Sequence, residues 1–415
     1  MPTSETPGAP MTVMRFIRDG AYLPKGKTFI LEPDGTLRKS VADHGYRAGG
    51  PGAFTVLRAG TAAELVACLG ALDPGMVCVW GAPPAECGAL AFDSEADPEK
   101  AVWSRGSRDF PAFEHVSVLA LDCDMPNAPG LEEYVSWLRG EVGFDCDLVG
   151  GFSSSAGIRR ADTGDLVSDT GGLRVYAIMR GGDRIPDVLN LILDRGWLRD
   201  PPWSRWIITE GGAAVQRGAA DLALKVPCQA DFAAAGALLE GELVQDRTWT
   251  VFEGDTRMQD VKTLNRLTPP EEKRVARNRF MAKARRAPEI KAAWDAYAKK
   301  CARTRAIKAV VAREFPDLES AMRKLLPEMR VVTRLAALEN RLGKAFPLQT
   351  TKGEVTVDEV LADPEAWDKV RTRDPLDPGY HGGEFCCTLL TGQGTAFLQV
   401  HHGPKQLYVL GNTRR

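Results

Sequence analysis

The stretch Val118-Leu-Ala-Leu-Asp122-Cys-Asp124 is the part of the sequence around which a fold can be built. Four apolar residues run into two carboxylates two positions apart, and on a β-strand this spacing puts both carboxylates on one face. Two neighbouring carboxylates repel each other and favour a bound cation, and their oxygen atoms suit Mg²⁺ or Mn²⁺ held together with substrate phosphates. The simpler alternative is a strand that ends in a turn, because Met125-Pro-Asn-Ala-Pro-Gly130 follows and Asp is common in turns.

Strands and helices alternate on both sides of this stretch. A Thr/Glu capping box predicts a helix from Thr61, and Met76 to Trp80 reads as a strand. Downstream, Asp147-Leu-Val-Gly-Gly-Phe152 is an apolar strand that opens into a serine loop, and Leu173-Arg174-Val-Tyr-Ala-Ile-Met179 is a second strand. A helix with Leu189, Ile192 and Leu193 on one face is expected from about residue 185 to residue 195. The pattern predicts a mixed fold of helices and strands.

A further apolar segment, Ala219-Ala-Asp221-Leu-Ala-Leu, carries one carboxylate. If the strands belong to one sheet, the carboxylate pair, the serine loop and Asp221 meet at one edge. Carboxylates, hydroxyl groups and an arginine together form the set that two-metal nucleotidyl transfer requires.

Composition limits the class of protein. With 415 residues, 44% hydrophobic and 26% charged, the chain should fold into about two or three compact units. It has no run of apolar residues long enough to span a membrane and no secretory signal, so we expect no membrane partner and a cytoplasmic location. The nine cysteines form an odd set without CxxC spacing, which argues against a disulfide framework and a zinc ribbon.

Positive charge is concentrated in one region. Residues 271–310 contain thirteen Lys and Arg residues against four Asp and Glu residues, although the whole chain has a net charge of −2. Such asymmetry is typical of a surface that contacts a phosphate backbone, although a solvated helix face is the alternative. The candidates for DNA contact are Lys273, Arg274, Arg277, Lys283, Arg285 and Arg286.

The order of these motifs resembles the archaeo-eukaryotic primase superfamily, in particular the primase-polymerase modules of phage and mobile-element replication proteins. The first family motif, an apolar strand ending in Asp-x-Asp, matches Leu119 to Asp124. The second is similar to Phe152-Ser-Ser-Ser-Ala-Gly-Ile and Gly171-Gly-Leu-Arg174. The third, a carboxylate at a strand end, best fits Asp221, with Asp231 as the alternative. The resemblance covers nearly the whole chain.

The resemblance implies an α+β fold with an archaeo-eukaryotic primase catalytic core, which is a mixed sheet with an RRM-like unit. We expect a disordered tail over residues 1–10 and the core over 11–255. A basic helical domain over 256–345 and a small C-terminal α/β module over 346–415 would follow.

The implied function is that of a DNA primase-polymerase, a nucleotidyltransferase that makes and extends primers on single-stranded DNA from NTP or dNTP substrates. The expected catalytic ligands of a two-metal Mg²⁺ or Mn²⁺ site are Asp122, Asp124 and Asp221. The expected nucleotide-binding residues are Ser153, Ser154, Ser155, Arg174 and Arg217. Arg217 also fits a structural salt bridge. Relatives often continue into a helicase, but no P-loop lies downstream here, so a separate replicative helicase is the expected partner.

One residue departs from the family pattern. The family usually has histidine in Gly-Gly-Leu-His, where this chain has Arg174. Arginine can still bind a triphosphate, but it cannot release a proton near neutral pH. A catalytically impaired, DNA-binding replication or defence accessory is therefore the second hypothesis. A metal-dependent nuclease is the third, because nucleases also use carboxylate-bound metal pairs.

Overall fold

The computed structural model describes most of the chain between Gly8 and Gly411. The residues outside the description are 1–7, 19–20, 23–26, 33–34, 42–51, 73–75, 84, 91–101, 104–112, 124, 126–129, 154–155, 169–171, 232, 234–237, 241–242, 246–247, 381–382, 392–395, 402–406 and 412–415.

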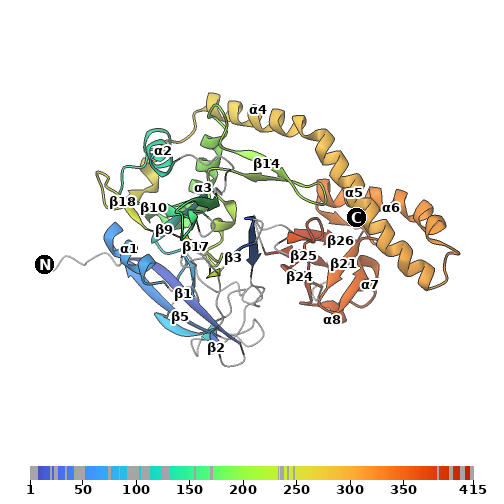
Figure 1. Ribbon diagram of the computed structural model, residues 1–415. Helices are drawn as coiled ribbons and strands as arrows, with labels where there is room; N and C mark the ends of the chain where they lie inside the picture. The colour runs from blue at the N-terminus through green and yellow to red at the C-terminus, as the bar shows by residue number, and fades with distance from the viewer. Residues whose placement is uncertain are drawn as a thin grey trace. The chain divides into compact units, whose positions relative to one another are not determined.

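The chain forms two compact units of mixed α and β structure (Figure 1). Unit 1 comprises Met1–Ser204 and Arg217–Ala276, and unit 2 comprises Arg205–Gln216 and Arg277–Arg415. Within the described ranges, none of the helices combines the length and the apolar character that a membrane crossing requires.

The first sheet of unit 1 is built on one long strand, β1, which pairs antiparallel with β5, β6 and β2. The helix α1 (Ala62–Gly70) follows β5, and its capping box of Thr61 and Glu64 is present as predicted. The strands are β1 (Ala9–Arg18), β2 (Ala21–Tyr22), β5 (Gly52–Ala59), β6 (Met76–Val79), β7 (Cys87–Leu90) and β8 (Val102–Trp103).

The central sheet of unit 1 contains the three strands that the sequence predicts around the carboxylate pair. β13 lies between β9 and β10 and is antiparallel to both. Every residue of β9 is buried except Asp122, which is partly exposed, so its continuous apolar run fits a strand covered on both faces. The strands are β9 (Val116–Cys123), β10 (Leu148–Phe152), β13 (Leu173–Arg180), β18 (Thr250–Phe252) and β19 (Gln259–Asp260).

Helices α2 (Leu131–Trp137) and α3 (Ile185–Gly196) pack into the same hydrophobic core as β9 and β13. A π-helical turn, Leu138–Val142, extends α2. The buried side chains of α3 include Leu189, Ile192 and Leu193, so the predicted apolar face is confirmed. Gly150 lets α2 approach the sheet, because a Cβ there would lie 2.8 Å from a methyl group of Leu131.

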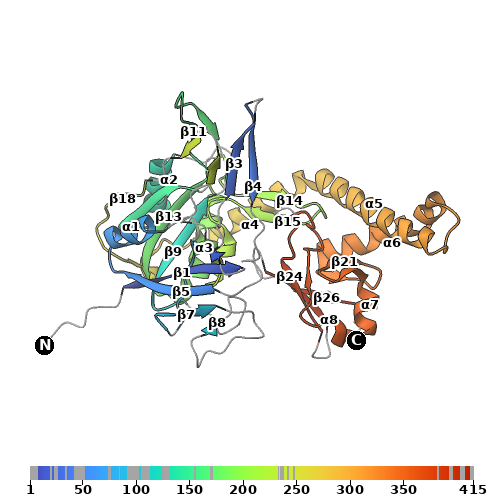
Figure 2. The same ribbon diagram turned by 60° about the horizontal axis from the view of Figure 1, so that its bottom comes forward.

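Two small sheets of unit 1 share a separate cluster of buried side chains, formed by Phe29, Ile158 and Leu243. In Figure 2 the β3–β4 hairpin is seen near β11. The strands of these sheets are β3 (Lys27–Leu31), β4 (Leu37–Val41), β11 (Ile158–Arg160), β12 (Leu166–Ser168), β16 (Leu238–Glu240) and β17 (Leu243–Gln245). Short 3-10 turns in unit 1 are Gly182–Arg184, Leu222–Lys225 and Val261–Thr263.

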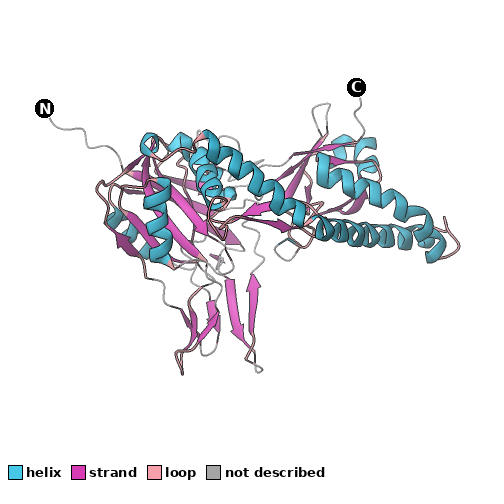
Figure 3. Cartoon of the chain, turned by 90° about the horizontal axis from the view of Figure 1, so that it is seen from above, coloured by secondary structure: helices cyan, strands magenta, loops and turns pink. Residues whose placement is uncertain are grey.

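Three long helices lie within residues 256–345, where a helical domain is expected. They are α4 (Pro269–Arg285), α5 (Ala287–Val311) and α6 (Leu318–Glu339). The boundary between the units falls inside α4, of which only Val275 is buried. Helices α5 and α6 form a helical hairpin (Figure 3). Its buried face combines alanines four residues apart on α5 with a stripe of apolar residues on α6. Because alanine side chains are small, the two helices can pack close together. These residues are Ala298, Ala302, Ala306, Ala321, Leu325, Met329, Val332 and Ala336.

A seven-stranded sheet completes unit 2, in the order β20-β26-β25-β24-β23-β21-β22. Its strands are β20 (Arg341–Leu342), β21 (Pro347–Thr350), β22 (Gly353–Thr356), β23 (Arg371–Thr372), β24 (Cys387–Leu390), β25 (Phe397–Val400) and β26 (Leu407–Leu410). The short helices are α7 (Val357–Ala362) and α8 (Pro364–Trp367). The hairpin of β14 (Arg205–Ile208) and β15 (Ala214–Arg217) also belongs largely to this unit.

The observed division differs from the expected domain boundaries. The expected tail over 1–10 overlaps β1, which begins at Ala9. The expected helical domain and C-terminal module form one unit, because buried residues of α5, α6 and the seven-stranded sheet share a single hydrophobic core. Residues 256–276 belong to unit 1, and the hairpin 205–216 belongs to unit 2. A helical pair with an apolar stripe needs a second surface to bury it, which the strands provide here.

Candidate active site

Asp122 and Arg174 lie opposite each other at one end of the central sheet. The antiparallel register of β9 and β13 pairs these two residues directly, and on the other side of β13 Arg174 is paired with Gly151 of β10. The serine loop begins at Ser153, immediately after β10. The first two predicted motifs therefore meet at one edge of the sheet. The expected site residues outside the described part of the chain are Asp124, Ser154 and Ser155.

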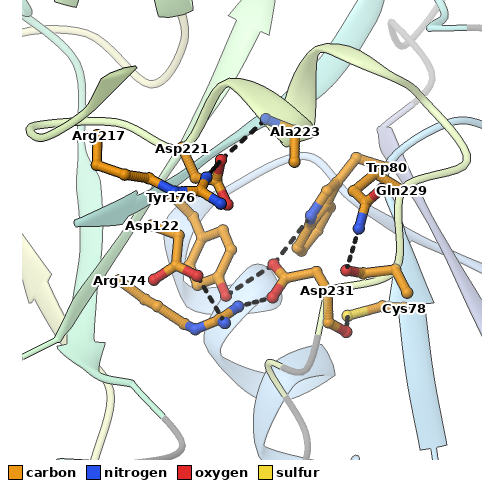
Figure 4. A network of polar contacts seen from close by, with 11 residues as sticks. Cys78, Trp80, Asp122, Arg174, Tyr176, Arg217, Asp221, Ala223, Gln229 and Asp231 are labelled. Carbon is orange, nitrogen blue, oxygen red and sulfur yellow. Dashed lines mark hydrogen bonds and ion pairs between the residues drawn. The ribbon is translucent and has the colours of Figure 1, made fainter. Parts of the chain in front are cut away.

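The guanidinium group of Arg174 bridges two carboxylates (Figure 4). One terminal nitrogen donates to Oδ2 of Asp122 at 3.1 Å, and the other forms an ion pair with Oδ1 of Asp231. The side chains of Arg174 and Asp231 are 6% and 1% exposed, whereas that of Asp122 is 17% exposed. Asp122 is thus the member of this group that solvent or a ligand can reach.

Asp231 is held at the network by both its main chain and its side chain. Its backbone forms an isolated antiparallel β-bridge with Cys78, in which the two N–H···O hydrogen bonds have N to O distances of 2.8 and 3.1 Å. Its Oδ2 accepts hydrogen bonds from Trp80 Nε1 at 3.1 Å and from the hydroxyl of Tyr176 at 3.2 Å. Burial raises the pKa of Tyr176 above its ordinary value, so the phenol stays protonated and donates. A guanidinium and two neutral donors together offset the cost of burying this carboxylate.

Arg217 and Asp221 form a second ion pair, with 2.5 Å between Nη1 and Oδ1. Figure 4 draws this pair in the same close-up as Asp122 and Arg174. We expected Asp221 to end a strand, and this prediction is wrong. Asp221 caps the 3-10 turn Leu222–Lys225 and accepts a hydrogen bond from Ala223 N–H at 3.0 Å. Asp is a favoured capping residue, so a local backbone requirement explains its position. For Arg217 the sequence left a structural salt bridge as the alternative, and the structure contains such a salt bridge, with Asp221.

Ser153 is buried, with 4% of its surface exposed. Its backbone N–H donates to the carbonyl of Gly172 at 2.8 Å, and its carbonyl accepts from Ala156 at 3.1 Å. This amide is therefore engaged within the fold.

The network contains three carboxylates and two guanidinium groups, so one negative charge remains. Among the residues that the structure describes, no group of three or more His, Cys, Asp or Glu side chains is arranged to hold a metal ion. Asp122 and Asp221 each share their carboxylate with an arginine. The described residues thus do not form a metal centre by themselves, and the expected ligand Asp124 lies outside the described residues.

The six expected DNA-contact residues divide between the units. Lys273 and Arg274 belong to unit 1, and the other four belong to unit 2. Arg286 is partly buried, donating to Trp206 O and pairing with Glu289. The exposed residues of the six are Lys273, Arg274, Arg277, Lys283 and Arg285.

Comparison with protein-family models, with curated proteins and with solved structures found no match for this chain. The site is therefore interpreted from its own geometry.

Sequence reasoning missed the partnership of Arg174 with Asp231. The sequence offers Asp231 only as an alternative third carboxylate, and its pattern places Trp80 and Tyr176 on ordinary strands. The one available signal was a basic residue inside the apolar segment Leu173–Met179, because a buried arginine requires an acidic partner. Nothing in the sequence says which carboxylate meets this requirement, since Asp231 is 57 residues away along the chain.

Proposed function

We propose that this protein is a primase-polymerase of the archaeo-eukaryotic type, which joins nucleotides on a single-stranded DNA template. Its core would be the primase core with an RRM-like unit, and its cofactor would be Mg²⁺ or Mn²⁺. The observation that carries the proposal is the pairing of β9, β10 and β13, which gathers Asp122, Arg174 and the start of the serine loop at one edge. This is the arrangement that the order of the motifs requires.

In this proposal Arg174 recognises the triphosphate of the incoming nucleotide. A guanidinium group can bind phosphate oxygens through two parallel hydrogen bonds, and Arg174 is already positioned by Asp231 from the buried side. Arg217, partly exposed beside Asp221, would add a second positive group. Asp122 is the described carboxylate with access to solvent at the strand end, and a cation there competes with Arg174.

The test is nucleotide incorporation by the full chain on single-stranded DNA, with labelled NTPs or dNTPs and with Mg²⁺ or Mn²⁺. We expect Asp122→Asn to abolish incorporation while DNA binding is retained. Asp162→Asn is the matched control, because Asp162 pairs with Arg160 at the surface of the same unit. Full incorporation by Asp122→Asn would refute the proposed role of this carboxylate.

A second candidate function is a catalytically inactive, DNA-binding replication or defence accessory. The hydrogen bond from Arg174 to Asp122 favours it, because the arginine already supplies the positive charge that a metal ion would bring. Arg174→His discriminates between the two functions. Incorporation by Arg174→His, where the native protein has none, would establish the accessory function, provided thermal unfolding shows that the variant folds. Shortening of the template without incorporation would instead indicate a nuclease.

A further inference from the structure

Unit 2 contains a hollow of about 270 Å³, and none of its lining residues belongs to the carboxylate network. Its walls come from the β14–β15 hairpin and from helices α4, α5 and α6. Lys283 provides the charge among its nine described lining residues, and the others are apolar or aromatic. Its aromatic lining residues are Phe280 and Trp294. The volume is slightly below the range of about 300–1,000 Å³ typical of sites for whole drug-sized ligands, so it suits a single ring system.

Phe280 stands at the rim of this hollow with 71% of its surface exposed. It lies on α4, a helix whose buried residues are limited to Val275 among those described. An aromatic ring exposed beside an apolar hollow offers a flat face against which another ring can stack. Trp294 lines the hollow as a second aromatic group.

Positive charge gathers at the same place. The ammonium of Lys283 lies 5.1 Å from the centre of the Trp206 ring, and Arg286 donates to the carbonyl of Trp206. The neighbouring residue, Arg205, is exposed, and its pKa is lowered by partial burial and then by the charge of Arg286. Glu289 neutralises Arg286, so Lys283 and Arg205 are the cations offered to a bound polyanion.

We propose that the hollow binds one unstacked base of single-stranded DNA, with Phe280 stacking on the base and Lys283 and Arg205 holding the flanking phosphates. This inference rests on the proposed function, because it takes single-stranded DNA as the ligand. Apolar walls match the face of a base, and the cationic rim matches its phosphates, so both halves of a nucleotide are complemented. An apolar protein segment would use the walls but would give Lys283 and Arg205 no anionic partner.

The experiment uses the full chain and a short single-stranded oligonucleotide carrying one 2-aminopurine, without nucleotides or added metal. Stacking on an aromatic ring quenches this fluorophore, so binding should lower its emission. Phe280→Ala should remove the quenching and raise the Kd about 5- to 150-fold, the range expected for loss of one stacked base. Phe280→Tyr should behave as the native chain does.

Met281→Ala is the matched control, because Met281 is the next residue on α4, is 45% exposed and does not line the hollow. It should leave quenching and Kd unchanged. A duplex of the same sequence should show little dependence on Phe280, because its bases remain stacked.

The outcome is independent of catalysis. Asp122→Asn should retain the quenching, so a catalytically inactive protein can still pass this test, and an active one can fail it. If Phe280→Ala binds and quenches the oligonucleotide as the native protein does, the hollow does not hold a base, and another occupant or none must be inferred.

Discussion

The central sheet of unit 1 and the seven-stranded sheet of unit 2 bury their polar groups in different ways. The central sheet buries Arg174 and packs it against the carboxylate of Asp231. The sheet of unit 2 buries hydroxyl groups, such as those of Thr350 and Thr372, which donate to nearby backbone carbonyls. The central sheet thus contains a buried ion pair, whereas these buried hydroxyl groups of the seven-stranded sheet are satisfied by nearby backbone carbonyls.

The difference matters because a buried ion pair is a poor way to stabilise a sheet. Removing two charges from water costs several kcal/mol per ion, and well-packed apolar residues often serve as well or better. The sheet of unit 2 demonstrates that this chain can build a core from apolar residues and short local hydrogen bonds. The ionic network in unit 1 is therefore better explained by the placement of Arg174 beside Asp122 than by stability.

The comparison is tested most strongly by Asp231→Ala. The substitution removes the carboxylate that pairs with the buried guanidinium of Arg174 and accepts from Trp80 and Tyr176. We expect the free energy of unfolding to fall by about 3–5 kcal/mol, measured by urea denaturation with tryptophan fluorescence.

Thr372→Val is the counterpart in unit 2. It replaces a fully buried hydroxyl that donates to the carbonyl of Arg373 at 2.9 Å, and a loss of about 1 kcal/mol is expected. An equal loss in the two variants would remove the distinction between the sheets.

Tyr176→Phe should cause a loss of stability between those of Asp231→Ala and Thr372→Val. It removes one donor to the charged carboxylate of Asp231, while the ring keeps its place between Trp80 and Trp249, whose centroids lie 5.1 and 5.5 Å away. Hydrogen bonds to charged groups contribute about 1.5–3 kcal/mol, and urea denaturation should show a loss of this size. No loss would mean that Arg174 and Trp80 suffice to hold the carboxylate.

The smallest effect is expected from an ion pair nearer the surface, between Arg195 and Glu271 at 2.7 Å. Hydrogen bonds from Thr268 to Glu271, with a smaller effect of Arg195, lower the pKa of Glu271 from its ordinary value of 4.5. A carboxyl whose pKa is lowered in the folded state stabilises it above the ordinary pKa, and this contribution is lost as the pH falls through the lowered pKa.

Glu271→Gln should therefore be less stable than the native chain at pH 7. The difference should shrink toward zero as the pH falls below 4.5, when urea midpoints of the two proteins are compared at each pH. A difference that stays constant with pH would mean that the charge of Glu271 does not contribute.

The sequence predicted the strands of the central sheet because their signal is local. Val118–Asp124, Asp147–Phe152 and Leu173–Met179 each combine an apolar run with a defined end, and β9, β10 and β13 occupy these places. The helical region was equally predictable, because Ala, Lys, Arg and Glu dominate residues 269–343 and glycine is nearly absent there. Asp221 was misplaced because an apolar segment of four to eight residues reads alike as a strand or as a helical turn.

The partners of Arg174 depend on tertiary structure. Asp231 reaches the network through its backbone bridge to Cys78, 153 residues away, and no periodicity in the sequence encodes that pairing. The same reason explains why the hairpin 205–216 was not assigned to unit 2: its contacts, such as Trp206 Nε1 to Arg279 O at 3.0 Å, join distant parts of the chain.

The chain leaves unit 1 at residue 204, returns at 217 and leaves again at 276. Cutting the chain after residue 276 would therefore not release unit 1 alone, because the hairpin would remain attached after its partners were removed. Glu210 would lose Lys300, and the Gly211 amide would lose the carbonyl of Leu376. Unit 2 is in this sense interleaved with unit 1 along the polypeptide, and removing both of its segments, with a short linker closing 204 to 217, is the cleaner way to isolate the carboxylate network.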